Sequence, residues 1–132
     1  MPGRQFTDDP NIPNSEILLR RLQSDWIVPG HRGRMRISSG AFKHEELSIL
    51  VWTLLERQGL TMADALTGYP GNALCSITAG LARELGQGVV CDTDPPHDPA
   101  RGLVIGKKTQ SVANRFAREA NWVVPSQAPL LP

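Results

Sequence analysis

Residues 44–59, HEELSILVWTLLERQG, form the most apolar run of the chain, and the rest of the fold must pack around them. Apolar side chains recur in this run at three- and four-residue steps, which places them on one face of a helix: Leu47, Leu50, Val51, Leu54 and Leu55. Gly59 follows at a position where a glycine commonly ends a helix. The pattern predicts a central amphipathic helix, although LSILVW can also begin as a buried strand.

The other segments predict short strands mixed irregularly with helices. Alternation of arginine with Met35 and Ile37 indicates a half-buried strand, and further strands are expected at 26–28, 74–77, 88–91 and 103–105. Helices are expected at 61–68, 78–85 and 111–121, while 16–28 and 73–78 stay open between helix and strand. We therefore expect an α+β fold, a single compact domain with the central helix, two or three further helices and a small mixed sheet of short strands.

The two ends of the chain differ in composition from its middle. Residues 1–13 contain three prolines and almost no apolar side chains, so we expect a flexible N-terminal tail. Residues 14–125 form the expected domain, and residues 126–132 form a proline-rich C-terminal tail.

Net charge, apolar run length and cysteine content limit which partners and which cell compartment we expect for the protein. The net charge of +1 argues against a nucleic-acid binder that works by bulk charge, so nucleic acid is a possible partner but not the favoured one. No apolar run reaches the roughly 20 residues of a membrane helix, and the first 13 residues lack a signal-peptide pattern. With only Cys75 and Cys91, we expect a cytoplasmic protein with reduced thiols and no membrane partner.

Most of the 14 basic residues are arginines, a bias that is typical of a GC-rich, prokaryotic-like genome. Arg32, Arg34 and Arg36 alternate along a predicted strand and therefore share one face. Such an arginine strip can bind a phosphate or an acidic protein surface, and Ser38 and Ser39 can add hydroxyl donors. A solvated strand face followed by a turn is the simpler explanation, because exposed charges also guard a strand edge.

A second basic cluster, Lys107, Lys108 and Thr109, lies between a predicted strand and a predicted helix. It partly matches the end of a P-loop, but Lys108 stands where that motif has serine or threonine, so a nucleoside triphosphatase is not predicted. A helix N-terminus nevertheless offers unpaired N–H groups and the positive end of the helix dipole. The cluster therefore predicts anion binding, with ordinary solvated lysines as the simpler alternative.

No catalytic or metal-binding motif stands out. The loop at residues 91–98, CDTDPPHD, contains metal-ligating side chains, but its prolines and spacing match neither a calcium loop nor a four-ligand zinc site, so no metal is expected. His97 and His44 lie in or beside predicted loops, where an acid–base role is possible. Neither cysteine has the surroundings of an activated nucleophile. Whether the protein uses a cofactor stays unknown from the sequence.

These observations favour a small cytoplasmic binding or interaction module. It would recognise a protein partner or a phosphate-bearing ligand through the arginine strip and the helix N-terminus. The alternative is a compact enzyme that acts on a nucleotide-like or phosphorylated substrate, in which both basic clusters and one histidine line a single pocket.

Overall fold

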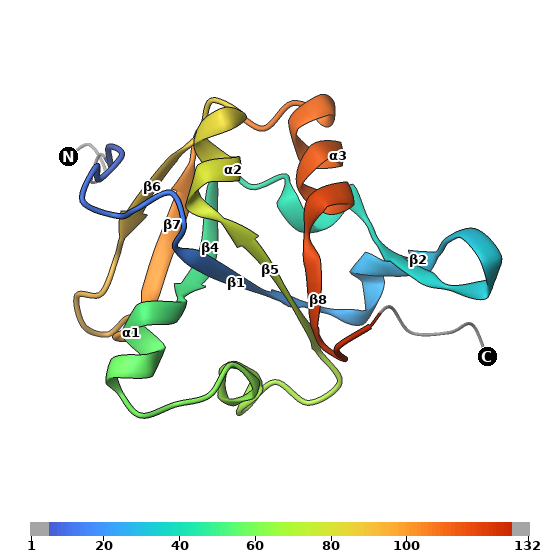
Figure 1. Cartoon of the computed structure of the whole chain (residues 1–132), viewed down its shortest axis with the longest axis horizontal. Helices are drawn as coiled ribbons and strands as arrows, with labels where there is room; N and C mark the ends of the chain where they lie inside the picture. The colour runs from blue at the N-terminus through green and yellow to red at the C-terminus, as the bar shows by residue number, and fades with distance from the viewer. Residues whose placement is uncertain (1–5, 128–132) are drawn as a thin grey trace.

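The chain folds around a six-stranded antiparallel sheet with the strand order β6-β7-β4-β1-β5-β8 (Figure 1). The computed structural model describes residues 6–127. The strands of this sheet are β1 (Ile17–Leu22), β4 (Glu46–Val51), β5 (Ala73–Thr78), β6 (Gly88–Cys91), β7 (Arg101–Ile105) and β8 (Asn121–Val124). Two further strands, β2 (Ile27–Pro29) and β3 (Met35–Ile37), pair with each other and form a hairpin arm that projects to the side of the molecule.

Short helices connect the strands of the described chain. The α-helices are α1 (Trp52–Arg57), α2 (Ala79–Glu84) and α3 (Gln110–Glu119). Single 3₁₀ turns form η1 (Ser24–Trp26), η2 (His31–Gly33), η3 (Ser39–Phe42) and η4 (Ala63–Leu66). Two of the α-helices have only six residues, so the sheet and not the helices organises the domain.

The expected central helix over residues 44–59 is wrong, and so is the α+β arrangement built around it. Residues 46–51 form β4 inside the large sheet, and only the six residues of α1 that follow are helical. Leu47 faces one apolar cluster while Leu50 faces the other, so this strand is buried on both faces. A strand covered on both faces is a continuous apolar run, and its leucines then imitate the spacing of an amphipathic helix.

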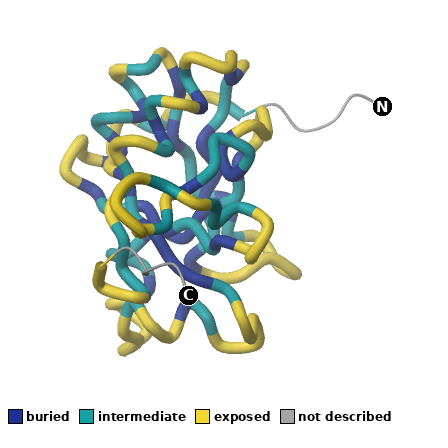
Figure 2. The backbone as a smooth tube through the Cα atoms, turned by 90° about the vertical axis from the view of Figure 1, so that its right-hand side faces the viewer, coloured by how far each residue is buried: buried dark blue, intermediate teal, exposed yellow. Residues whose placement is uncertain are grey.

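The sheet carries an apolar core on each face. One face packs against α2, α3 and η3, where the rings of Phe42 and Phe116 stack with their centroids 5.5 Å apart. The opposite face packs against α1 and η4 through Leu55 and Ala65. Figure 2 shows the consequence: buried segments run through the centre of the molecule, and exposed backbone is concentrated in the connecting turns.

Several local signals in the sequence are confirmed. The stretches left open between helix and strand contain β1, β2 and β5. Thr78 ends β5 and caps α2, because its hydroxyl accepts a hydrogen bond from the Leu81 N–H at 3.1 Å. Thr61 and Asp64 form a reciprocal capping box, with hydrogen bonds of 2.7 Å and 3.3 Å to each other's backbone N–H groups.

The described part of the expected N-terminal tail packs against the domain. Ile12 is only 7% exposed and belongs to the larger core cluster. The Asp9 N–H donates to the carbonyl of Val89 in β6, and the Arg83 guanidinium binds the Asp8 carboxylate at 3.1 Å. Residues 6–13 are therefore part of the domain, while residues 1–5 and 128–132, with most of the expected C-terminal tail, lie outside the described residues.

We expect Phe116→Ala to lower the free energy of unfolding by about 3–5 kcal/mol, because Phe116 is fully buried and stacked on Phe42. Phe116→Leu, which keeps much of the apolar volume, should lose clearly less. Urea denaturation of the three proteins measures both values. A loss below about 1 kcal/mol for Phe116→Ala would show that α3 does not depend on this contact.

Removal of residues 1–13 should lower the midpoint of urea denaturation, because it deletes the buried Ile12 side chain and the contacts of Asp8 and Asp9. A point variant, Ile12→Ala in the full chain, should lose a share of the same stability, on the order of 2 kcal/mol. Equal midpoints for the truncated and the full chain would contradict the packing described above.

Candidate functional site

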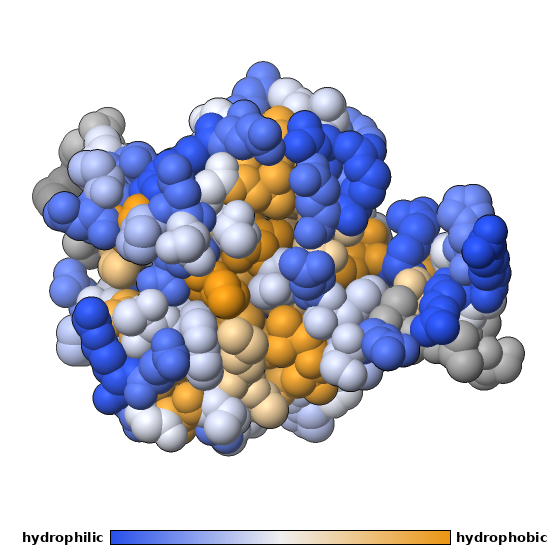
Figure 3. Space-filling model, viewed as in Figure 1, coloured by the Kyte–Doolittle hydropathy of each residue, from blue (hydrophilic) through white to orange (hydrophobic). Residues whose placement is uncertain are grey.

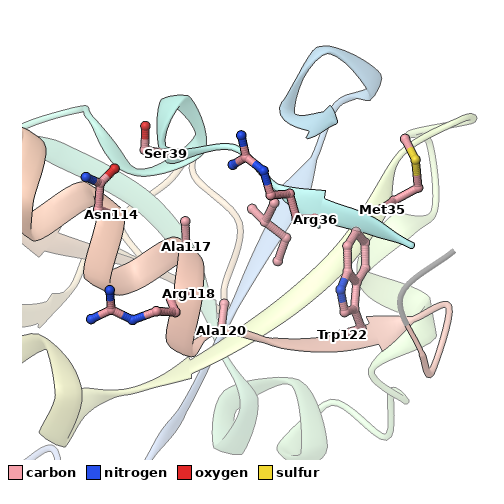
Figure 4. Close-up of a pocket in the computed structure, with 9 residues that line it drawn as sticks. Met35, Arg36, Ser39, Asn114, Ala117, Arg118, Ala120 and Trp122 are labelled. Atoms are coloured by element: carbon pink, nitrogen blue, oxygen red, sulfur yellow. The ribbon is translucent and has the colours of Figure 1, made fainter. Parts of the chain in front are cut away.

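A groove of about 560 Å³ lies between the hairpin arm, α3 and β8 (Figure 4). Residues from β3, η3, α3 and the segment into β8 line it: Met35, Arg36, Ile37, Ser39, Asn114, Ala117, Arg118, Ala120 and Trp122. Small and apolar side chains alternate with two arginines, two neutral polar groups and one indole. This combination of cations, hydrogen-bond donors and a flat aromatic ring makes the groove the candidate functional site.

The burial patterns of β3 and α3 place the polar groups of the groove. Ile37 is only 4% exposed, so the alternation of the strand turns Arg36 outward. On α3, Phe116 is buried in the core, while Asn114 and Arg118 lie one helical turn apart on an exposed flank. The Ser38 N–H donates to the Trp26 carbonyl at 2.7 Å, which fixes the base of the arm beside η3.

Arg36 and Arg118 carry charges that no other described residue neutralises. Neither guanidinium forms an ion pair or a hydrogen bond with another residue in 6–127, whereas Arg115, on the same helix, pairs with Glu119 and lies 3.2 Å from Glu84. In Figure 4 the two free guanidinium groups do not converge on one point, since Arg118 extends along α3, away from Arg36. They therefore suit a ligand that extends along the groove better than a single small ion.

Gln110, at the start of α3, orients two neutral donors toward the groove. Its side-chain N–H groups donate to the Ser39 hydroxyl oxygen at 3.0 Å and to the Asn114 amide oxygen at 2.8 Å. Because both oxygens accept from Gln110, the Ser39 O–H and the Asn114 amide N–H groups are left to donate to a ligand. The lining residues include no histidine, cysteine, aspartate or glutamate, so they offer binding groups but no acid–base group that titrates near neutral pH.

The predicted arginine strip is only partly brought into this groove. Arg36 and Ser39 line it, but Arg32 and Arg34 do not. Arg32 lies in the turn η2 at the end of the arm, where it adopts a left-handed backbone conformation with φ 56°. Ser38 caps η3 by accepting a hydrogen bond from the Gly40 N–H at 3.2 Å, as a turn residue does. Figure 3 shows the projecting arm as mostly hydrophilic.

The predicted lysine cluster lies apart from the groove, and its members are used by the fold. The Lys108 ammonium donates to the carbonyls of Glu45, Val104 and Gly106 at 3.1, 2.8 and 3.0 Å, which occupies all three of its N–H bonds. Thr109 is the N-cap of α3, because its hydroxyl accepts from the Val112 N–H at 3.2 Å. Lys107 is exposed, and its carbonyl accepts a hydrogen bond from the Gln87 amide.

The two histidines considered for acid–base chemistry also lie outside the groove. His97 Nδ1 is 3.1 Å from an Arg101 N–H donor, and His97 Nε2 is 3.6 Å from the Asp92 carboxylate. Because a guanidinium can only donate, Nδ1 must accept and Nε2 must carry the proton that faces Asp92. Nδ1 is thus occupied by Arg101 of β7, and Nε2 lies near the Asp92 carboxylate, away from the groove. His44 is exposed before β4 and lines none of the groove.

The cysteines have the properties of structural thiols. Cys75 is fully buried in β5, and burial raises the pKa of its thiol to about 12. Burial also raises the pKa of the half-buried Cys91, and the nearby Asp9 carboxylate adds to that effect. Neither thiol is activated at neutral pH, since a reactive cysteine requires a lowered pKa.

Comparison with known proteins gives no relative for this chain: neither a scan against protein-family models, nor a search of curated proteins, nor a search of solved structures found a match. Between residues 6 and 127, no three potential ligands among histidine, cysteine, aspartate and glutamate are grouped so as to hold a metal ion. No helix in that range is both long enough and apolar enough to span a membrane.

Sequence reasoning missed Asn114, Arg118 and Trp122. Asn114 and Arg118 are four residues apart in a helix that the sequence predicted, so the sequence pattern already placed both on one flank of that helix. The pattern could not show that this flank lies opposite β3, because that position follows from the packing of α3 against η3 and the sheet.

The buried Lys108 ammonium should make stability rise with pH. Burial lowers the pKa of Lys108 to about 8, below the value of 10.5 for an unperturbed lysine, and Glu45 opposes the shift. Between these two pH values the unfolded chain binds more protons than the folded chain, so the free energy of unfolding increases as pH rises. We expect a gain on the order of 1–2 kcal/mol from pH 8 to pH 10, since one pKa unit corresponds to about 1.4 kcal/mol.

The measurement is urea denaturation of the wild type and of Lys108→Met at both pH values. The variant should lack this gain, while shared contributions from other titrating groups cancel in the comparison. An equal pH dependence in the two proteins would show that Lys108 keeps its ordinary pKa.

Proposed function

We propose that the protein is a binding module whose groove between β3, α3 and β8 takes a phosphate-bearing ligand of the nucleotide type. The observation that carries this proposal is the pair Arg36 and Arg118, two guanidinium groups on one groove that have no partner within the described chain. Guanidinium groups bind phosphate oxygens through paired, charge-assisted hydrogen bonds. The hydroxyl of Ser39 and the amide of Asn114 supply further donors to the same anion.

The aromatic and apolar part of the groove supports a nucleotide over a bare phosphate. Trp122 lines the groove and is partly exposed, while its other contacts are with the core beneath it. An indole offers a surface for a base, and stacking on an aromatic side chain contributes about 1–3 kcal/mol per base. The separation of the two arginines along the groove also favours a ligand that carries its charge at more than one point.

The lining favours binding over catalysis. An enzyme acting on the same ligand requires an acid–base group in the pocket, and the nine lining residues include none that titrates near neutral pH. The lysine cluster and both histidines, which the enzyme alternative would bring into this pocket, are located elsewhere in the described structure.

The proposal predicts that Arg36→Gln combined with Arg118→Gln weakens nucleotide binding at least tenfold, which corresponds to about 1.4 kcal/mol. Isothermal titration at low salt with a nucleoside diphosphate and with a short single-stranded oligonucleotide measures this effect. Arg57→Gln removes one positive charge from exposed α1, on the other side of the molecule, and should bind as the wild type does. Trp122→Leu should weaken binding of the nucleoside diphosphate more than binding of pyrophosphate.

Two outcomes would contradict the proposal. One is equal nucleotide affinity in the wild type and in the double arginine variant. The other is binding of an acidic peptide without phosphate in preference to every nucleotide, which would assign the groove to a protein partner.

A further inference from the structure

Arg20 occupies a position in β1 where the strand pattern calls for an apolar side chain. Leu18 and Leu22, its neighbours on the same face of the strand, are both fully buried. Burying a charged group is costly unless an opposite charge or hydrogen bonds compensate it. Within residues 6–127, no carboxylate lies within ion-pair distance of Arg20.

A split in the large sheet makes room for this side chain. β1 pairs with β4 only at Leu18↔Val51 and Leu19↔Leu50, and the two strands part beyond that point. The Arg20 guanidinium bridges the opening, with Nε donating to the Ala41 carbonyl at 3.1 Å and Nη1 donating to the Ser48 carbonyl at 3.0 Å. The Trp26 ring covers it, with its centroid 4.8 Å from the guanidinium carbon.

Arg21 borders the same opening from the other face of β1. Its guanidinium carbon lies 3.9 Å from the centroid of the Tyr69 ring, and Nε donates to the Ala65 carbonyl at 2.6 Å. No described carboxylate pairs with Arg21 either. A guanidinium has five N–H bonds, and the recorded contacts use two of those of Arg20 and one of those of Arg21. Most donors of both groups are therefore available to a ligand.

A cavity of about 190 Å³ lies at this opening, and both arginines are among its lining residues. The other polar lining residues are neutral, namely Gln23, Ser48, Tyr69 and Asn72, and no acidic residue is among the lining. The cavity has room for a small ion with a few waters. Burial lowers the pKa of Arg20 to about 10, which still leaves its guanidinium a cation at neutral pH.

We infer that this cavity in the β1–β4 split is a second, separate anion site that binds a phosphate group between Arg20 and Arg21. The bound dianion supplies the countercharge that the described chain lacks, and Trp26 and Tyr69 hold the two guanidinium planes in place. The cavity shares no lining residue with the groove of the proposed function, so the two sites can be tested independently.

Titration of the full chain with inorganic phosphate, in buffer with sodium chloride matched in ionic strength, tests the inference. We expect saturable binding to the wild type and a rise in melting temperature beyond that in chloride, because a ligand of the folded state stabilises it. Arg21→Gln should weaken phosphate binding at least tenfold. Arg20→Gln removes two hydrogen bonds that close the sheet and can impair folding, so Asn72→Ala is the second variant and should also weaken binding.

Arg57→Gln removes one positive charge from exposed α1 outside both sites, so it is the matched control and should bind phosphate as the wild type does. A titration with adenosine monophosphate distinguishes the source of the phosphate group. Binding that Arg21→Gln weakens assigns the cavity to the phosphate of a larger ligand. No binding of adenosine monophosphate assigns the cavity to the free phosphate ion. No saturable binding by the wild type, equal binding by Arg21→Gln, or loss of binding in Arg57→Gln would each overturn the inference. Failure of the nucleotide experiment at the groove leaves this result unaffected.

Discussion

Burial of the middle strands on both faces is the constraint on which the rest of the structure depends. β4, β1 and β5 are adjacent in the sheet, and each contributes side chains to both apolar clusters. Backbone N–H and C=O groups in such strands have no access to water and must pair within the sheet, so these strands occupy its interior and leave β6 and β8 at its edges. The same burial requires a cover on each face, which α2 and α3 provide on one side and α1 with η4 on the other.

Signals that depend on neighbours along the chain were predictable from the sequence. The Thr78 cap, the Thr61–Asp64 capping box and the strand at 88–91 each need only a few adjacent residues to form. Residues 46–51 could not be assigned to a strand rather than a helix from the pattern alone, because burial on both faces removes the alternation that identifies a strand. The docking of residues 6–13 was equally hidden, since it rests on one apolar side chain, Ile12, and on polar contacts with a distant helix.

The residues of the candidate site also fall into two groups: those that a local sequence pattern places, and those that only the fold brings together. Arg36 and Ser39 belong to a local pattern, and their exposure follows from the alternation around Ile37. Arg118 and Trp122 join them only because α3 packs beside the arm, which is a long-range consequence of the Phe42–Phe116 contact. Lys108 shows the opposite error of sequence reasoning. Its charge suggested a ligand, but the fold directs the ammonium at three backbone carbonyls, of which that of Glu45 also accepts from the Gly106 N–H.

Donor number explains why arginine and lysine have different roles where strand pairing stops. In a continuous ladder each carbonyl accepts from a backbone N–H, which leaves one lone pair at most for a side chain. Arg20 binds the Ser48 carbonyl at the β1–β4 split, and Lys108 binds the Val104 carbonyl near the end of β7. An ammonium has three N–H bonds, and Lys108 uses all of them on the fold. A guanidinium has five in a rigid plane, so Arg20 can close the sheet with two of them and still present the others to an anion.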